Sequence, residues 1–293
     1  MLKGQIVRAV SGFYYIEHED QVYESKARGL FKLKNETPLV GDYVEFSVNE
    51  NNSGMIEKLL PRKNELKRPP ICNVDQVLLV TSAVEPDFNT LVLDKFIVHI
   101  EKAQIPIVIC FTKLDLLGVT SEINDIIDAY EKIGYSTIKC DFSVVELDRL
   151  KIHLNGKTTV LAGQSGVGKS TLINRLIPDA HASVSRVSEK IGRGKQTTRE
   201  VQLYKLGQGA MIADAPGFSQ LDFAEISVEE LGTIYREFAL HAEHCRFRGC
   251  LHHNEPDCGV KAAVEQSLID SRRYESYLTF LEELIERDKQ KWR

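Results

Sequence analysis

Apolar and polar positions alternate over the first part of the chain in short runs, and turn-forming residues interrupt them. Alternation with a period of two residues is typical of half-buried strands. Five short strands in so short a segment favour a small β-barrel of the OB type, a fold that often holds nucleic acid. The predicted strands span residues 4–10, 13–17, 21–24, 42–48 and 55–59.

The hydrophobic pattern changes after a polar, proline-bounded connector at residues 61–70. Near-continuous apolar runs, as found in strands buried on both faces, now alternate with segments of helical spacing. Such an alternation predicts a parallel, doubly wound α/β sheet. In chain order the predicted elements are strand 74–81, helix 89–102, strand 105–111, helix 121–133, strand 135–139, helix 147–154, strand 156–162 and helix 170–177.

The remainder of the chain begins with a polar, aperiodic segment at residues 182–200, which is too long for an idle connection inside a compact domain. Two strands are predicted over 201–206 and 209–213, and the pattern is helical from about residue 228. A cysteine- and histidine-rich cluster interrupts it before a last helix over 261–292. The predicted domains are an OB-type barrel over residues 1–62, an α/β domain over 63–222 and a mainly helical domain over 223–293.

The bulk composition is that of a globular protein, with 43% hydrophobic and 27% charged residues. No apolar run reaches membrane-spanning length and the N-terminus lacks a signal-peptide core, so we expect a cytoplasmic protein without a membrane anchor. A net charge of −5 gives no global sign of nucleic-acid binding. A loop with Phe31 among Lys26, Arg28, Lys32 and Lys34 reads equally well as an RNA contact or as an ordinary solvated loop.

One stretch between a predicted buried strand and a predicted helix reads G-x-x-x-x-G-K-[ST], the phosphate-binding P-loop. Its glycines let backbone N–H groups approach an anion, and the helix N-terminus adds the positive end of its dipole. Lys169 can reach the terminal phosphates, and the Ser170 hydroxyl can ligate magnesium. The predicted triphosphate-binding residues are Gly163, Gln164, Ser165, Gly166, Val167, Gly168, Lys169, Ser170 and Thr171.

Thr112-Lys113-Leu114-Asp115 follows a predicted buried strand and resembles the base-recognition motif [NT]-K-x-D. The Asp115 carboxylate would accept hydrogen bonds from N1–H and the 2-amino group of guanine. Adenine has neither donor, so the motif favours GTP over ATP. Thr112 replaces the commoner asparagine, and Lys113 can lay its stem over the base.

Asp214-Ala-Pro-Gly217 follows an apolar strand and fits D-x-x-G. Asp214 would hold magnesium through water, and the Gly217 N–H would contact the γ-phosphate. A hydroxyl of Thr197 or Thr198 would complete the magnesium shell, and Thr198 is favoured. Phe218 stands where many GTPases place a water-orienting glutamine, so slow intrinsic hydrolysis is expected. Gln196 is an internal candidate for the missing group.

The order of these motifs is unusual, because the base motif precedes the P-loop, whereas in ordinary GTPases it follows. A sheet with the same strand neighbours but a different cut in the chain, a circular permutation, explains this order. The γ-phosphate-sensing segments then lead directly into the C-terminal domain. We therefore expect the position of that domain to respond to the nucleotide state.

Three cysteines are bunched near the end of the chain in a Cys-x4-Cys-x-His-x5-Cys pattern, whereas the other three lie in or beside apolar segments. Three thiolates and one imidazole suit a closed, tetrahedral structural zinc site, one per chain. The neighbouring His241, His244 and His253 compete for the fourth position. The predicted zinc ligands are Cys245, Cys250, His252 and Cys258.

The permuted order, the nucleotide motifs and the zinc-type cluster resemble those of the RsgA family of bacterial GTPases over essentially the whole chain. The resemblance implies an OB-fold domain and a GTPase that is stimulated by the small ribosomal subunit and binds its rRNA. We expect the protein to be a monomer. The resemblance also implies action late in the maturation of that subunit, and magnesium with GTP. It favours His252 as the fourth zinc ligand. Family members commonly have histidine where this chain has Gln196, so proposals for that histidine do not carry over simply.

Two other classes of function stay open on the residues alone. The chain could be a zinc-bearing RNA-binding module in which nucleotide only regulates binding. A kinase or ATPase built on the P-loop is disfavoured by Asp115. Turnover measured with and without small ribosomal subunits separates the first alternative from a ribosome-dependent GTPase.

Overall fold

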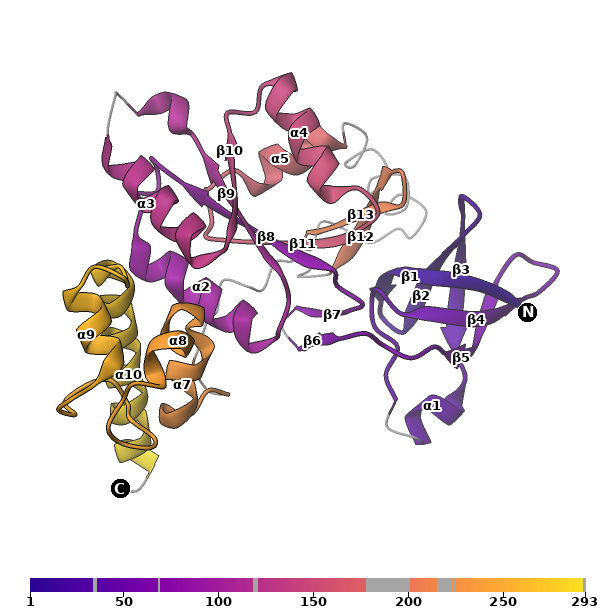
Figure 1. Cartoon of the computed structure of the whole chain (residues 1–293). Helices are drawn as coiled ribbons and strands as arrows, with labels where there is room; N and C mark the ends of the chain where they lie inside the picture. Colours follow the sequence, from indigo (N-terminus) through magenta and orange to yellow (C-terminus); the bar gives the residue numbers. More distant parts are fainter. Residues whose placement is uncertain are drawn as a thin grey trace. The chain divides into compact units, whose positions relative to one another are not determined.

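The computed structural model describes residues 1–33, 36–67, 69–117, 121–177, 201–214, 223 and 225–291 (Figure 1). The chain forms two compact units, and each combines two segments that are distant in sequence. The first unit contains Met1–Val80 and Cys140–Ser219, and the second contains Thr81–Lys139 and Gln220–Arg293. The domain limits expected near residues 62 and 222 stay predictions.

The N-terminal part of the first unit is a closed five-stranded barrel, which confirms the predicted fold (Figure 1). Its strands follow the order β1-β2-β3-β5-β4, and pairing of β1 with β4 closes the circle. Side chains such as Ile6, Ile16 and Phe46 fill the interior and are fully buried. The strands are β1 (Leu2–Val10), β2 (Phe13–His18), β3 (Gln21–Ala27), β4 (Tyr43–Val48) and β5 (Gly54–Leu59).

The predicted basic loop is a short helix, α1 (Gly29–Leu33), and its aromatic residue belongs to the barrel core. Phe31 is 7% exposed and packs with the interior side chains of the barrel. Arg28 is paired with Glu57 at 2.9 Å. The interpretation of Phe31 as an accessible aromatic residue among basic side chains is therefore wrong, because its ring is buried. The buried ring holds α1 on the barrel. Lys34 and the side chain of Lys32 lie outside the described residues.

The connector after the barrel is ordered by hydrogen bonds. Arg62 binds the fully buried Asp42 through two bonds of 2.7 Å each, Nε to Oδ1 and Nη2 to Oδ2. A buried carboxylate with this pairing is satisfied, so the connector is fixed to the base of the barrel. Two short strands, β6 (Glu65–Lys67) and β7 (Pro70–Cys72), form a separate hairpin beyond it.

The rest of the first unit is an α/β layer with the strand order β8-β11-β13-β12. The central strand β11 is parallel to β8 and β13, as predicted for a doubly wound sheet. β12 is antiparallel to β13 and also pairs with β1 of the barrel at Arg8 and Gln202. The elements are β8 (Gln76–Ser82), α4 (Val144–Leu154), β11 (Thr158–Ala162), α5 (Lys169–Leu176), β12 (Gln202–Gly207) and β13 (Ala210–Asp214).

The second unit contains the strands β9 and β10, one α-helix before each of them, and the C-terminal helices. The helix predicted over 261–292 is broken, because Ser267 has a φ of +58° and Asp270 accepts a hydrogen bond from the Arg272 N–H. The elements are α2 (Thr90–Lys102), β9 (Ile107–Thr112), η1 (Leu114–Leu116), α3 (Ser121–Ile133), β10 (Ser136–Cys140), α7 (Val228–Ile234), η2 (Arg236–Phe238), α8 (Ala239–Ala242), α9 (Gly259–Glu265) and α10 (Ser271–Lys291).

A large apolar core joins the C-terminal helices to α2. Tyr277, Leu281 and Leu284 on α10 are fully buried in it, so the apolar stripe on this helix is a packing surface, as expected. Phe223 lies in the same core, and its ring stacks on His99 of α2 with centroids 5.2 Å apart. Among the helices of the described residues, none has the length and apolarity needed to cross a membrane.

A buried ion network lies in this second unit, where α10 meets α2. Arg273 on α10 is 3% exposed and donates to Asp94 of α2 and, at 2.7 Å, to Glu237 of η2. Asp94 also accepts from the Tyr130 hydroxyl at 2.6 Å. Burial raises the pKa of Asp94, and the attraction of Arg273 and the bond from Tyr130 partly offset that rise. One guanidinium thus compensates two carboxylates, of which Asp94 is fully buried and Glu237 is 7% exposed.

Candidate functional site

The P-loop residues connect β11 to α5 within the first unit. β11 is buried along its whole length because it lies between β8 and β13. Gly163, Gly166 and Gly168 have φ angles of +132°, +85° and +103°, which residues with a side chain rarely adopt. A Cβ on Gly163 would also lie 2.1 Å from the carbonyl oxygen of Val80. The first glycine of the motif therefore permits both the turn and the close approach to β8.

The polar side chains of the P-loop are accessible at the start of α5. Ser170 is exposed and Lys169 is half-buried. The Lys169 ammonium bonds to the carbonyl oxygens of Gly163 and Gln164, at 2.8 Å from the first. This places a positive charge over the loop whose N–H groups and helix dipole attract anions. The geometry suits a polyphosphate.

The Thr112–Asp115 motif lies in the second unit, at the carboxyl end of β9. Thr112 is fully buried, and its hydroxyl donates to the Thr81 carbonyl oxygen at 3.2 Å. Lys113 adopts a left-handed conformation with φ +58° and donates to the Glu85 carbonyl oxygen. Asp115 follows in η1 and is exposed. Thr112 thus anchors the loop, and the carboxylate of Asp115 is available to a ligand.

The magnesium-sensing motifs are described only in part. Asp214 is the last residue of β13 and pairs in register with Leu161 of β11, which places it one strand from the P-loop. Its side chain lies outside the described residues, as do Gly217 and Phe218. The segment 178–200, which contains Gln196 and Thr198, also lies outside them.

The four predicted zinc ligands come together in the second unit. The ligand atoms of Cys245, Cys250, His252 and Cys258 all lie within 4.8 Å of one another. Nδ1 of His252 is 3.5 Å from the Cys245 sulfur and 3.4 Å from the Cys258 sulfur, and these two sulfurs are 3.8 Å apart. In the described part of the chain, this group includes none of the competing histidines.

These separations match the edges of a tetrahedral zinc site. Zinc bonds of about 2.3 Å to sulfur and about 2.0 Å to nitrogen at tetrahedral angles place two sulfurs about 3.8 Å apart and a sulfur and a nitrogen about 3.5 Å apart. Burial lowers the pKa of His252, which favours the neutral imidazole that a metal needs. The donor set therefore fits a structural zinc ion.

The loop around His252 is held by surrounding hydrogen bonds. The Glu255 carboxylate accepts from the N–H groups of Leu251 at 2.7 Å and His253 at 2.9 Å. Tyr274 of α10 donates to the His252 carbonyl oxygen at 2.6 Å. His252 itself has φ +54°, a conformation that these bonds maintain. Such support fixes the orientation of the imidazole, and sequence spacing alone gave no sign of it.

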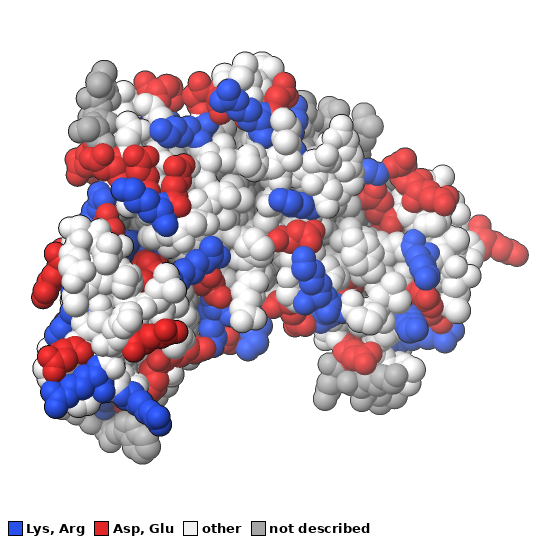
Figure 2. All heavy atoms as spheres, in the orientation of Figure 1, with Lys and Arg blue, Asp and Glu red and all other residues white. Residues whose placement is uncertain are grey.

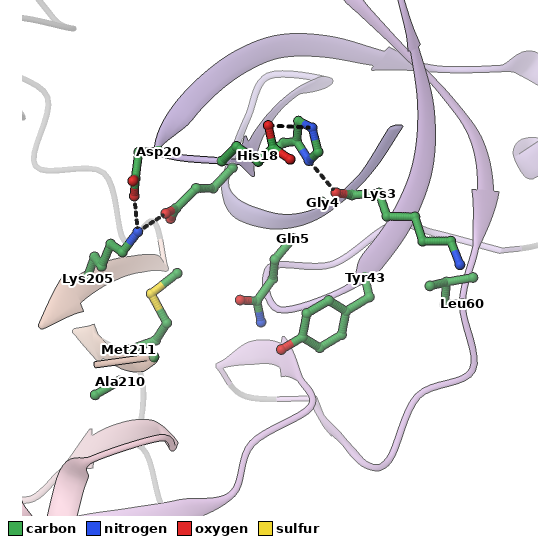
Figure 3. A pocket seen from close by; sticks show the side chains of 13 residues that line it. Lys3, Gly4, Gln5, His18, Asp20, Tyr43, Leu60, Lys205, Ala210 and Met211 are labelled. Atoms are coloured by element: carbon green, nitrogen blue, oxygen red, sulfur yellow. Dashed lines mark hydrogen bonds and ion pairs between the residues drawn. The ribbon is translucent and has the colours of Figure 1, made fainter. Parts of the chain in front are cut away.

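The hollow shown in Figure 3 lies in the first unit, where the barrel meets the β12–β13 hairpin, and has a volume of about 430 Å³. The Lys205 ammonium lies between the carboxylates of Glu17 and Asp20, at 2.9 Å from the first. The Nδ1–H group of His18 donates to the Lys3 carbonyl oxygen at 2.8 Å. These residues fall in no sequence motif, and their contacts fasten the hairpin to the barrel.

Charges of both signs are interspersed over the face shown in Figure 2, as expected from the net charge of −5. In the described residues of the zinc-type cluster, Arg246 and Arg248 are exposed, and Phe247 between them is 44% exposed. Arg246 pairs with Asp257 at 2.9 Å, and its Cζ atom lies 5.5 Å from the centroid of the Phe247 ring. The basic side chains of this loop are therefore accompanied by an acidic one.

A P-loop that follows the parallel strand β11, together with a T-K-x-D loop that follows β9, is the motif set of a P-loop GTPase. Because the T-K-x-D loop comes first in the chain, the fold is a circularly permuted member of that class. Two family models match: the RsgA GTPase over residues 59–224 and the RsgA N-terminal domain over residues 3–56. The chain belongs to the RsgA GTPase family.

Relatives of similar length extend this assignment. A small ribosomal subunit biogenesis GTPase RsgA 2 from Oceanobacillus iheyensis is 48% identical over 97% of this chain and 98% of its own. The corresponding protein of Streptococcus pneumoniae is 45% identical over 98% and 96%. YloQ, described as a circularly permuted GTPase, matches at 40% identity with a TM-score of 0.81 over 98% and 96% of the two chains. YjeQ from Thermotoga maritima matches at 35% identity with a TM-score of 0.84 over 97% and 98%.

Proposed function

We propose that the protein is a GTPase that binds the small ribosomal subunit through its rRNA and acts late in the maturation of that subunit. The full-length likeness to small ribosomal subunit biogenesis GTPases carries this proposal, and the permuted order of nucleotide motifs supports it. GTP is hydrolysed to GDP and phosphate, and hydrolysis is coupled to release from the particle or to a checkpoint. The protein acts as a monomer in the cytoplasm.

In this proposal each nucleotide motif has its own role. The N–H groups of 163–171 and the Lys169 ammonium bind the phosphates, and Ser170, Thr198 and Asp214 hold magnesium. Magnesium, when bound with GTP, neutralises charge that develops on the β- and γ-phosphates. Thr112 and Lys113 shape the base site, where Asp115 selects guanine. Gln196 orients the attacking water. Many GTPases assign this role to a glutamine at the position that Phe218 occupies here.

The zinc ion has a structural role in the proposal. Cys245, Cys250, His252 and Cys258 would hold one ion per chain and leave it no open position. The ion links the loop at 245–258 to the start of α9, since Cys258 is the residue before that helix. The exposed Arg246 and Arg248 can then contact rRNA phosphates from a rigid loop.

The proposed function is tested by GTP turnover of the purified protein with and without purified small ribosomal subunits. We expect subunits to raise turnover by roughly tenfold or more. The chain lacks a water-orienting glutamine after Gly217, so the partner would provide a catalytic group or reposition one of the chain's own. Lys169→Ala should abolish the stimulated turnover. Lys151→Ala, on an exposed part of α4, is the matched control and should leave it unchanged.

Two outcomes would contradict this function. Subunits that bind the protein without changing turnover would favour the zinc-bearing RNA-binding module. Turnover that does not respond to Lys169→Ala would exclude the P-loop as the phosphate site.

The neighbouring histidines allow a matched test of the metal site. We expect one zinc per chain in the purified protein and in the His253→Ala variant, but less than half of that in His252→Ala. The reason is that Nδ1 of His252 lies within 3.5 Å of two cysteine sulfurs. Zinc content is measured by atomic emission, and thermal unfolding of the same samples is followed by circular dichroism. Equal zinc in both variants would remove His252 from the ligand set.

A further inference from the structure

A turn at residues 141–143 lies against the P-loop within the first unit. It follows β10 and precedes α4, and no nucleotide motif of the sequence includes it. A Cβ on Gly168 would lie 3.0 Å from the Cζ atom of Phe142 and within 3.9 Å of two further ring atoms. The Phe142 ring therefore covers the Cα of the last glycine of the P-loop, directly before Lys169.

Phe142 makes this contact from an unfavourable backbone conformation. Its φ of +62° is rare for a bulky residue and would suit glycine or asparagine better. The turn is fixed on both sides, because the Asp141 carboxylate accepts from the Ser143 N–H at 2.8 Å and Ser143 caps α4 through Glu146. Hydrogen bonds from the side chain and from the backbone N–H of Ser143 lower the pKa of Asp141. A strained aromatic at such a position indicates a functional constraint.

The ring of Phe142 is not needed to fill the core of its own helix. It is half-buried, whereas Leu147, Leu150 and Leu154 form the buried face of α4. Val144 and Val145, at the start of α4, are 75% and 61% exposed. The ring packs against the P-loop glycine, Gly168.

We propose that Phe142 is a positioning residue for nucleotide binding, which holds Gly168 and the first N–H groups of α5 in the arrangement that receives the phosphates. This inference rests on the proposed role of the P-loop in binding GTP. A ring that stacks on Gly168 restricts the conformations of the loop, so less ordering is required when phosphate binds. Without the ring the loop is less restricted, and bound nucleotide leaves faster.

Gly168 and Phe142 are also matched in size. The φ of +103° disfavours a side chain at residue 168, and a Cβ there would also press on the Phe142 ring at 3.0 Å. The sequence motif explains this glycine by its backbone conformation alone. The structure adds a second reason, namely the aromatic surface that covers it.

The test measures the dissociation rate of a fluorescent GDP analogue by stopped flow, with the full-length protein. We expect Phe142→Ala to release it about tenfold faster, which corresponds to about 1.4 kcal/mol. Phe142→Tyr should restore slow release because it keeps the ring. Val144→Ala, two residues further along, is the matched control and should release the analogue at the wild-type rate.

Phe142→Gly separates positioning from stability. Glycine relieves the backbone strain at φ +62°. The thermal midpoint of the Phe142→Gly variant should therefore equal or exceed that of Phe142→Ala, while both variants release the GDP analogue quickly. Slow release from Phe142→Gly or Phe142→Ala would overturn the inference. Wild-type protein that binds no GDP analogue would instead overturn the proposed role of the P-loop, so the two failures are distinguishable.

Discussion

Replacement of Asp115 by asparagine is expected to weaken GTP binding by about 100-fold to 10,000-fold. The carboxylate would accept two hydrogen bonds from guanine, and bonds to a charged group are each worth about 1.5–3 kcal/mol. Asparagine presents an NH2 group to one of these donors. Xanthine carries a carbonyl oxygen at that position, so affinity for XTP should rise as affinity for GTP falls. Equilibrium titration with fluorescent analogues of both nucleotides measures the two changes.

Asp128→Asn makes the same chemical change at an exposed position on α3 and is the matched control. It should bind GTP and XTP as the wild-type protein does. An Asp115→Asn variant that also keeps its GTP affinity would show that the base is recognised elsewhere. The ATPase interpretation would then need to be considered again.

Replacement of Arg273 by methionine is expected to lower the free energy of unfolding by about 3–5 kcal/mol, because it leaves buried carboxylates without a counter-charge. Asp94 is fully buried and Glu237 is nearly so. The loss should appear as a lower midpoint in urea unfolding of the full-length protein. Detachment of α10 from α2 would accompany it, since Arg273 joins Asp94 and Glu237 from two other elements.

Arg272 offers a control on the same helix. Its guanidinium pairs with Asp270 at 2.6 Å but is 34% exposed, so Arg272→Met should cost less than about 1 kcal/mol. A triple variant, Arg273→Met with Asp94→Asn and Glu237→Gln, should recover part of the loss because no buried charge remains. An equal effect of Arg272→Met and Arg273→Met would contradict the role assigned to burial.

Local sequence patterns predicted those parts of the fold in which each side chain lies either in the core or in solvent. The helix expected over 121–133 is α3 (Ser121–Ile133), since its apolar positions repeat with a helical period on one face. The ligand spacing in 245–258 likewise placed His252 with three cysteines. In both cases the information lies within a short stretch of chain.

Contacts between distant residues were beyond such patterns. Phe31 reads as one aromatic in a basic loop, and only the position of α1 on the barrel explains its burial. The contact of Phe142 with Gly168 and the pairing of Arg273 with Asp94 join residues far apart in sequence. The break before α10 depends on a left-handed Ser267, a conformation for which serine carries no strong signal.

The position of β11 between β8 and β13 has a consequence for how the chain is made. β8 ends at Ser82, but β11 begins only at Thr158. During translation at roughly 5–20 residues per second, about 75 further residues must be added before that partner exists, which takes on the order of 4–15 s. For this time one edge of an apolar strand has no partner and can pair with other chains. The cut in the permuted chain thus sets how long this edge of β8 stays without its partner strand during synthesis.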